Sequence, residues 1–286
     1  MGRVFIPENL ESLWEVLERE PASVIYAGGT DLLVRLGHTF RSLPSLVCLE
    51  RIGELKGAED HGDRVLIRAG STHTHLLANP ILRREFPVLI KALQVLGSPP
   101  IRNMGTIGGN LCTASPAGDT LPALTVLGAE VEIGSSAGFR RIPLKDFIQG
   151  PGKTSRQARE IVCGVWVKKN PDWTIHHYEK AGQRRAMAIS IASLAGLLKV
   201  SGSGVIERAR FAWGSVGPAV ITSDELEGGL VRRPLSRQTL EEAASLARQL
   251  VSPIDDVRAT AEYRREVSGN LLLRLLDYSH GSARIE

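Results

Sequence analysis

The sequence predicts an α+β protein with more than one domain. In the first 171 residues, short apolar segments typical of strands alternate with amphipathic helical segments. After residue 172, several strand-like segments come before two long helical ones, which is typical of a separate α+β layer domain. With 286 residues, of which 43% are hydrophobic and 23% charged, the chain has the length and composition of a globular protein with substantial cores.

The N-terminal part begins with a predicted helix over residues 7–20, because Leu10, Leu13 and Leu17 recur at helical spacing. A strand over residues 24–27 follows, and it leads directly into two glycines. The other elements expected in this part are a helical turn at 32–36, helices at 86–96 and 120–127, and strands at 45–49, 64–69, 130–133, 139–142 and 160–167. Residues 98–100, Ser-Pro-Pro, are expected to end the helix before them.

The C-terminal part is expected to form a strand over 174–180 and a hairpin of strands 189–200 and 205–213. Helices over 236–250 and 257–278 follow. We find no repeat at solenoid spacing.

Composition excludes several classes of function. The formal charge is only +4, from 35 basic and 31 acidic residues, and aromatic residues make up 5%, so a nucleic-acid-binding surface is not expected. No uncharged apolar run approaches the roughly 18 residues of a membrane span, and the N-terminus lacks the apolar core of a signal peptide. We therefore expect a soluble, cytoplasmic protein. Cys48, Cys112 and Cys163 are too scattered for a metal site, a cluster or a disulfide framework.

The first candidate site is the turn Gly28-Gly29-Thr30-Asp31, between the predicted strand and the helical turn. Glycines allow positive φ and remove Cβ, so that several backbone N–H groups can converge on one anion. A dinucleotide diphosphate suits such a nest. A tight turn that needs glycine for its geometry alone is the alternative.

The second candidate site is the segment 102–119, which is treated as a long polar loop. It contains Gly108 and Gly109, and its polar side chains are those of Thr106, Asn110, Thr113, Ser115 and Asp119. So many hydrogen-bonding groups inside a compact domain favour a large polar ligand. Neither a nicotinamide-type Gly-x-Gly-x-x-Gly fingerprint nor a Gly-Lys-Ser/Thr phosphate loop is present.

These motifs resemble the FAD-binding medium subunits of the xanthine dehydrogenase and carbon monoxide dehydrogenase (molybdenum hydroxylase) family. The matching segments are 27–32 (Ala-Gly-Gly-Thr-Asp-Leu), 106–110 (Thr-Ile-Gly-Gly-Asn), 114–119 (Ala-Ser-Pro-Ala-Gly-Asp) and 178–180 (Tyr-Glu-Lys) with Arg184-Arg185. The resemblance covers essentially the whole chain. It implies a PCMH-type, vanillyl-alcohol-oxidase-like fold with FAD-binding lobes at 1–57 and 58–171 and a C-terminal α+β domain at 172–286.

The resemblance also implies which residues contact FAD. They are Ile25, Ala27, Gly28, Gly29, Thr30, Asp31 and Leu32 around the diphosphate, Thr106, Ile107, Gly109, Asn110, Thr113 and Ser115 in the second segment, and Asp119, Val162 and Lys180 elsewhere. Lys180 would lie near the flavin ring, where its positive charge would favour the anionic reduced form. Alternatively, Asp119 caps the helix at Thr120, Lys180 is a solvated strand residue and Val162 belongs to the core.

The function that the resemblance implies is electron transfer through non-covalently bound FAD. Molybdopterin would lie on a large partner subunit and the iron–sulfur clusters on a small one, in a dimer of heterotrimers, and this chain would carry no metal and no catalytic side chain. Several relatives have acidic residues where this chain has Ala186-Met187-Ala188, which argues against NAD as the acceptor. The alternatives are a free-standing FAD-dependent oxidoreductase with its own small substrate and a scaffold subunit that has lost the cofactor.

Overall fold

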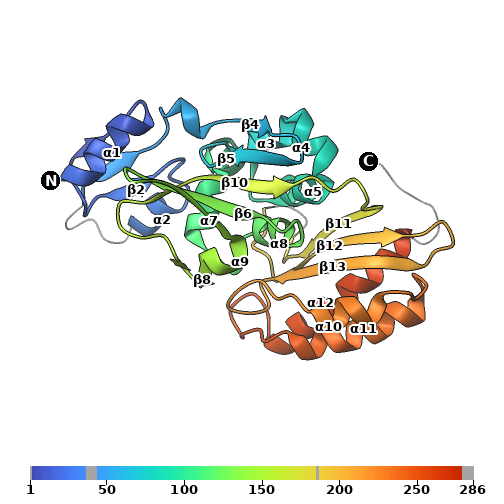
Figure 1. Cartoon of the computed structure of the whole chain (residues 1–286). Helices are drawn as coiled ribbons and strands as arrows, with labels where there is room; N and C mark the ends of the chain where they lie inside the picture. Colours follow the sequence, from blue (N-terminus) through green and yellow to red (C-terminus); the bar gives the residue numbers. More distant parts are fainter. Residues whose placement is uncertain (1, 37–43, 185–186, 279–286) are drawn as a thin grey trace. The chain divides into compact units, whose positions relative to one another are not determined.

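The computed structural model describes residues 2–36, 44–184 and 187–278, which fall into two compact units (Figure 1). The first unit takes the chain up to residue 83 together with 97–114 and 128–169. The second unit takes 84–96, 115–127 and the chain from residue 170 onward. Arg185, part of a matching motif, and Ala186, part of the argument on the acceptor, lie outside the described residues.

A small parallel sheet opens the first unit. Its strands are β1 (Val4–Phe5), β3 (Leu46–Cys48) and β2 (Val24–Tyr26), in that order. Helix α1 (Leu10–Arg19) packs its buried Leu13 and Leu17 in one core cluster with Val47 of β3. Asn9 begins this helix, because its side-chain Oδ1 accepts a hydrogen bond of 2.8 Å from the amide of Ser12. The helix predicted at 7–20 is therefore confirmed.

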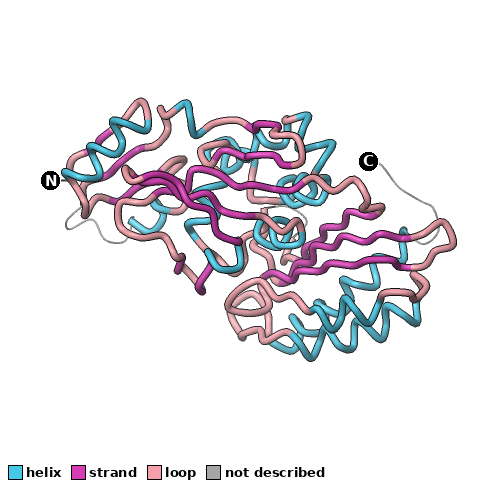
Figure 2. Tube along the Cα trace, viewed as in Figure 1, coloured by secondary structure: helices cyan, strands magenta, loops and turns pink. Residues whose placement is uncertain are grey.

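The larger sheet of the first unit is antiparallel and has five strands, whose course Figure 2 shows. Its strands, in spatial order, are β4 (Ala58–Asp60), β5 (Arg64–Arg68), β10 (Ile161–Lys168), β6 (Glu130–Ser135) and β7 (Gly138–Pro143). The central strand β10 is buried along all of its length except Lys168. Protection on both faces explains its nearly continuous apolar sequence.

Several short elements of this unit were not predicted. The unpredicted strands are β1, β4, β8 (Ile148–Gly150) and β9 (Lys153–Thr154). The unpredicted helical elements are α3 (His73–Ala78), α4 (Pro80–Glu85), α6 (Pro99–Met104), α7 (Ile107–Thr113), α9 (Leu144–Phe147) and the 3-10 turn Gly53–Leu55. The expectation that residues 102–119 form a long polar loop is wrong, because α6 and α7 occupy most of that segment. Pro99 and Pro100 also begin α6, since the first turn of a helix needs no N–H donor.

The second unit contains an antiparallel sheet of β11 (Ile175–Ala181), β12 (Ala192–Val200) and β13 (Ile206–Gly214). Its helices are α5 (Pro87–Val95), α8 (Thr120–Val126), α10 (Asp224–Leu230), α11 (Arg237–Leu250) and α12 (Ala261–Leu273), with a final 3-10 segment Arg274–Tyr278. The unit therefore includes two helices, α5 and α8, that lie well before residue 172 in the sequence. The division into domains at 1–57, 58–171 and 172–286 stays a prediction.

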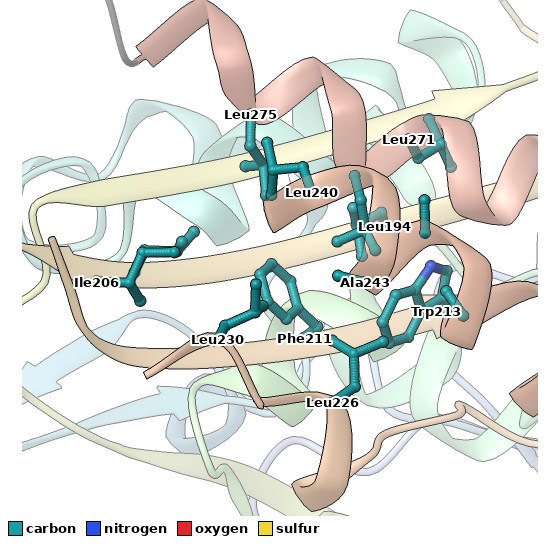
Figure 3. Close-up of a cluster of buried hydrophobic side chains, with 14 of the residues drawn as sticks. Leu194, Ile206, Phe211, Trp213, Leu226, Leu230, Leu240, Ala243, Leu271 and Leu275 are labelled. Carbon is teal, nitrogen blue, oxygen red and sulfur yellow. The ribbon is translucent and has the colours of Figure 1, made fainter. Parts of the chain in front are cut away.

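Strand β12 is buried on both faces of its sheet. Its Ala192, Leu194 and Leu198 belong to the core cluster that the sheet forms with α10, α11 and α12 (Figure 3). Side chains alternate along a strand, so the residues between them point to the other face, and β12 also contacts α5 and α8. Trp213 of β13 lies in the cluster, and its indole N–H donates to the carbonyl of Ser268 in α12 at 3.1 Å.

Candidate functional site

The two glycine segments singled out in the sequence meet inside the first unit. A Cβ on Gly28 would lie 1.7 Å from the carbonyl oxygen of Met104, at the end of α6. Only glycine therefore permits this approach of the two backbones. Gly105 and Thr106 follow Met104 directly, so the contact places the first glycine turn beside the start of α7.

The turn at 28–31 offers unused backbone donors. Its amides, from Gly28 to Asp31, donate to no acceptor among the described residues. The carbonyls of Gly29 and Asp31 accept hydrogen bonds from the amides of Leu33 and Arg35 in α2 (Leu32–Leu36). Gly29 has φ of 69°, in the left-handed region. Successive amides around a left-handed residue form a concave nest that suits an anionic ligand such as a phosphate.

The amides of the second glycine segment are already engaged. The N–H groups of Ile107, Gly108 and Gly109 donate to the carbonyl of Ser71 at 3.1 Å, the carbonyl of Ala69 at 2.8 Å and the hydroxyl of Thr106 at 3.1 Å. Thr106 thus acts as the N-cap of α7. The segment can therefore offer a ligand its side chains and the open face of the helix, but not these amides.

Gly108 and Gly109 serve different purposes. A Cβ on Gly108 would lie 2.6 Å from the Cβ of Ala69 and 2.9 Å from its carbonyl oxygen, so Gly108 is needed for packing against the end of β5. A Cβ on Gly109 would meet only the hydroxyl of Thr106, at 3.0 Å. Both glycines line a cavity, and at Gly109 the absence of a side chain leaves space inside it.

The cavity lies in the first unit and encloses about 100 Å³. Five of the residues expected to contact FAD line it, namely Ile25, Ala27, Thr106, Gly109 and Val162. Ten further residues complete its wall: Tyr26, Leu49, Leu55, Ala69, Gly70, Gly108, Cys112, Arg156, Glu160 and Ile161. Because most of the lining is apolar and the unused amides of the 28–31 turn lie next in sequence to its edge, the site suits a flat ring joined to a phosphate.

A side-chain contact joins the glycine turn to α7. The hydroxyl of Thr113 lies 3.3 Å from a carboxylate oxygen of Asp31 and 3.0 Å from the carbonyl oxygen of Gly109, and its single proton is donated to one of the two. The same oxygen of Asp31 pairs with Arg35 at 2.8 Å. Thr113 and Asp31 were both expected to contact FAD. The structure gives their side chains a role in joining the two segments. Ile107, in contrast, has a fully buried side chain, and Leu32 begins α2.

Asn110, also predicted, is a half-buried residue of α7 in the first unit, whereas Ser115, Asp119 and Lys180 belong to the second unit. The ammonium of Lys180 lies 2.7 Å from a carboxylate oxygen of Asp119, and the side chains are only 8% and 9% exposed. The hydroxyl of Tyr178 donates to the other oxygen of this carboxylate at 3.2 Å. Asp119 makes no side-chain capping bond to α8, so that alternative is wrong.

The Asp119–Lys180 pair is buried and nearly neutral as a whole. Burial raises the pKa of Asp119, whereas the ammonium of Lys180 and the hydroxyl of Tyr178 oppose this rise. Lys180 was expected to present a positive charge to the flavin ring. The pairing shows that this charge is balanced by Asp119 at short range, and that Lys180 is not a solvated strand residue.

The sequence did not reveal most of the cavity wall. Leu49, Leu55 and Ile161 look like any other core residue in the sequence, and the cavity shows only in three dimensions. Tyr26 lies just before the first glycine turn and Cys112 lies inside the second glycine segment. This position in the sequence is the only feature that could have indicated that they line the cavity. In the part of the chain that the structure describes, no three metal-ligating side chains gather, and no helix has the length and apolar character of a membrane crossing.

Comparison with protein families gives two matches. Residues 1–167 match the family described as FAD binding domain in molybdopterin dehydrogenase, and residues 176–279 match the CO dehydrogenase flavoprotein C-terminal domain. The FAD subunit of nicotinate dehydrogenase from Eubacterium barkeri is 30% identical, with 97% of both chains covered. The putative xanthine dehydrogenase FAD-binding subunit of Escherichia coli (strain K12) is 32% identical, with 87% of this chain and 86% of the relative covered.

Solved structures are similar over nearly the whole chain. A chain in the crystal structure of quinoline 2-oxidoreductase from Pseudomonas putida 86 superposes with a TM-score of 0.92 and 26% identity, covering 99% of this chain and 98% of that one.

Proposed function

Because this chain belongs to the family of FAD-binding medium subunits of xanthine and carbon monoxide dehydrogenases, we propose that it holds FAD in the first unit, with the diphosphate on the 28–31 turn. The single observation that carries this placement is the run of unused amides from Gly28 to Asp31 beside a mostly apolar cavity. The residues present fit the group, since the turn offers donors to the diphosphate and the cavity offers aliphatic walls to an aromatic ring.

The chain's own residues bind and orient the cofactor. Gly109 leaves space in the cavity, and the contact between Thr113 and Asp31 joins the turn to α7. In the second unit, the Asp119–Lys180 pair offers hydrogen-bonding groups with little net charge. Bound FAD supplies the capacity to take up electrons singly and to release them singly or in pairs.

The chain is the flavoprotein subunit of a multi-subunit oxidoreductase, as its relatives are. We infer that a small subunit with iron–sulfur clusters delivers electrons to the FAD, that a large subunit carries molybdopterin, and that the complex is a dimer of heterotrimers in the cytoplasm. The family relationship disfavours a free-standing oxidoreductase. The intact glycine turn disfavours a scaffold subunit without cofactor.

The test is to produce the chain with its neighbouring gene products and to purify the complex. We expect a flavin absorbance spectrum with one FAD per copy of this chain, released by acid without covalent attachment, and co-purification of iron and molybdenum with two other polypeptides. A colourless chain would refute the FAD site. A yellow chain that purifies alone, oxidises a small substrate and contains no iron would favour the free-standing enzyme.

A further inference from the structure

Arg156 is the only lysine or arginine among the residues that line the cavity. It is exposed, and it lies in the segment between β9 and β10. Its Nη1 donates to the carbonyl oxygens of Glu160 at 2.7 Å and Gln157 at 3.3 Å. These bonds hold the guanidinium at the cavity wall. Among the described residues, Nε and Nη2 of Arg156 have no acceptor, so three N–H donors remain for a ligand.

The charge of Arg156 is not cancelled by its surroundings. Its two acceptors are backbone carbonyls, which carry no net charge. Glu160 is the only acidic residue lining the cavity, and both of its oxygens bind Arg140, each at 2.9 Å. The amide of Gln157 also donates to the Glu160 carboxylate, at 2.7 Å. Glu160 acts electrostatically on both Arg140 and Arg156, so the three side chains together leave one positive charge beside an otherwise mostly apolar cavity.

We propose that Arg156 binds the AMP half of FAD, the part that FMN lacks, and that it gives this chain part of its preference for FAD over FMN. The proposal rests on the proposed function above. A planar guanidinium can pair with the oxygens of a phosphate or lie on the face of an adenine ring. The AMP half supplies the adenine ring and the second phosphate of the diphosphate, and these are the two partners proposed for Arg156. The aliphatic cavity wall suits the adenine ring, and the 28–31 turn beside it suits the phosphates.

The test uses the full chain freed of flavin and titrated with FAD and with FMN, followed by flavin fluorescence. The variant is Arg156→Ala, and the matched control is Lys153→Ala, which removes a positive charge from an exposed residue of β9 that does not line the cavity. We expect Arg156→Ala to raise the Kd for FAD about tenfold at low salt. The Kd for FMN should not change, and Lys153→Ala should alter neither.

A third variant, Arg156→Lys, identifies the contact. Recovery of wild-type FAD affinity would assign a phosphate, because a lysine keeps the charge, and no recovery would assign the adenine face, because a lysine is not planar. Both results support the proposal. It is overturned if Arg156→Ala matches Lys153→Ala, or if it weakens FAD and FMN by the same factor while the thermal melting curve is unchanged. Failure of the wild-type chain to bind FAD would instead contradict the proposed function.

Discussion

At the scale of single residues, the glycines of the two segments have different structural roles. The backbone of Gly28 touches the end of α6, Gly108 packs on Ala69, and Gly109 faces the cavity. A sequence shows all three as glycines in a ligand-binding segment. The space around each missing Cβ separates the glycines that build the site from the one that leaves room for the ligand.

Gly109→Val and Gly108→Ala should therefore affect different properties, the first FAD binding and the second stability. The valine side chain would extend into the cavity, so we expect FAD to be lost while the far-UV spectrum and the melting temperature stay close to those of the flavin-free wild type. The alanine at 108 would collide with Ala69, and we expect it to lower the free energy of unfolding by about 2 kcal/mol. Flavin at wild-type stoichiometry in Gly109→Val would refute the placement of the ligand.

The buried Asp119–Lys180 pair leads to a prediction about the stability of the second unit. Lys180→Ala would leave a buried carboxylate without its counter-ion, and we expect the second unit to lose about 3 kcal/mol of stability in urea unfolding. Lys199→Ala is the control, because Lys199 pairs with Glu207 at 3.0 Å on an exposed face, and its loss should cost under about 1 kcal/mol.

The double variant Asp119→Ala with Lys180→Ala completes this test. It removes the unpaired charge and should recover part of the lost stability. Equal effects of Lys180→Ala and Lys199→Ala would contradict the account of a buried pair.

At the scale of elements, the strongly periodic segments were predictable and the short capped helices were not. Helix α11 and strand β10 carry long apolar patterns, and both were located correctly. Helices α6 and α7 are short, and they depend on single capping residues, Ser98 and Thr106, inside a polar segment. Helix α6 also contacts α3, and α7 contacts β10 and bonds to the turn after β5 through the amides of Ile107 and Gly108. These partners are far away in sequence, so no local pattern predicts the two helices.

The same reasoning explains what the sequence showed of the site. The glycine segments were recognisable because they must satisfy a backbone constraint, and four predicted residues in or beside them line the cavity, namely Ile25, Ala27, Thr106 and Gly109. The pairing of Asp119 with Lys180 was not foreseen, because it joins positions far apart in the chain. The charge of Arg156 was likewise hidden, since many arginines of the chain lie at exposed positions.

Thr106 provides a prediction for α7. Its hydroxyl accepts from the amide of Gly109, so Thr106→Ala would remove the N-cap and leave that amide without a partner beside the cavity. We expect a loss of about 1 kcal/mol in unfolding free energy and weaker FAD binding. Thr106→Ser keeps the hydroxyl and should restore both. Unchanged stability in Thr106→Ala would show that the cap does not hold this helix.

At the scale of the whole molecule, the α+β architecture with an FAD-binding part and a C-terminal part is confirmed by the family matches and by the solved structures. Each unit has its own sheet and its own core. The chain alternates between the two units, because α5 and α8 of the second unit lie in sequence between segments of the first unit. The first unit is therefore assembled from three separate segments of the chain.

Acid should destabilise the molecule through its buried histidines. Burial, with a smaller contribution from Arg102, lowers the pKa of His73 from 6.5 to about 4. In the unfolded chain His73 takes up a proton below pH 6.5, but in the folded chain it does so only near pH 4. Stability is thus fully present above pH 6.5 and is lost as the pH falls toward 4, by at most about 3 kcal/mol for this group.

The pH dependence is measured by urea unfolding between pH 4.5 and 7.5. His73→Gln should show a shallower loss of stability toward acid than the wild type, and His75→Gln, which changes an exposed histidine of the same helix, should not. Some acid sensitivity should remain in both variants, because burial also lowers the pKa of His177 in the second unit to about 4. Identical profiles for the two variants would contradict the burial of a neutral His73.

Backbone hydrogen exchange with and without FAD tests the placement of the cofactor most directly. The amides of residues 28–31 have no acceptor among the described residues, so they should exchange quickly in the flavin-free chain and become strongly protected when FAD binds. The amides of Gly108 and Gly109 are already bonded and should change less. If FAD binds with full stoichiometry and peptides covering 28–31 exchange as fast as before, the diphosphate is held elsewhere and the account is wrong.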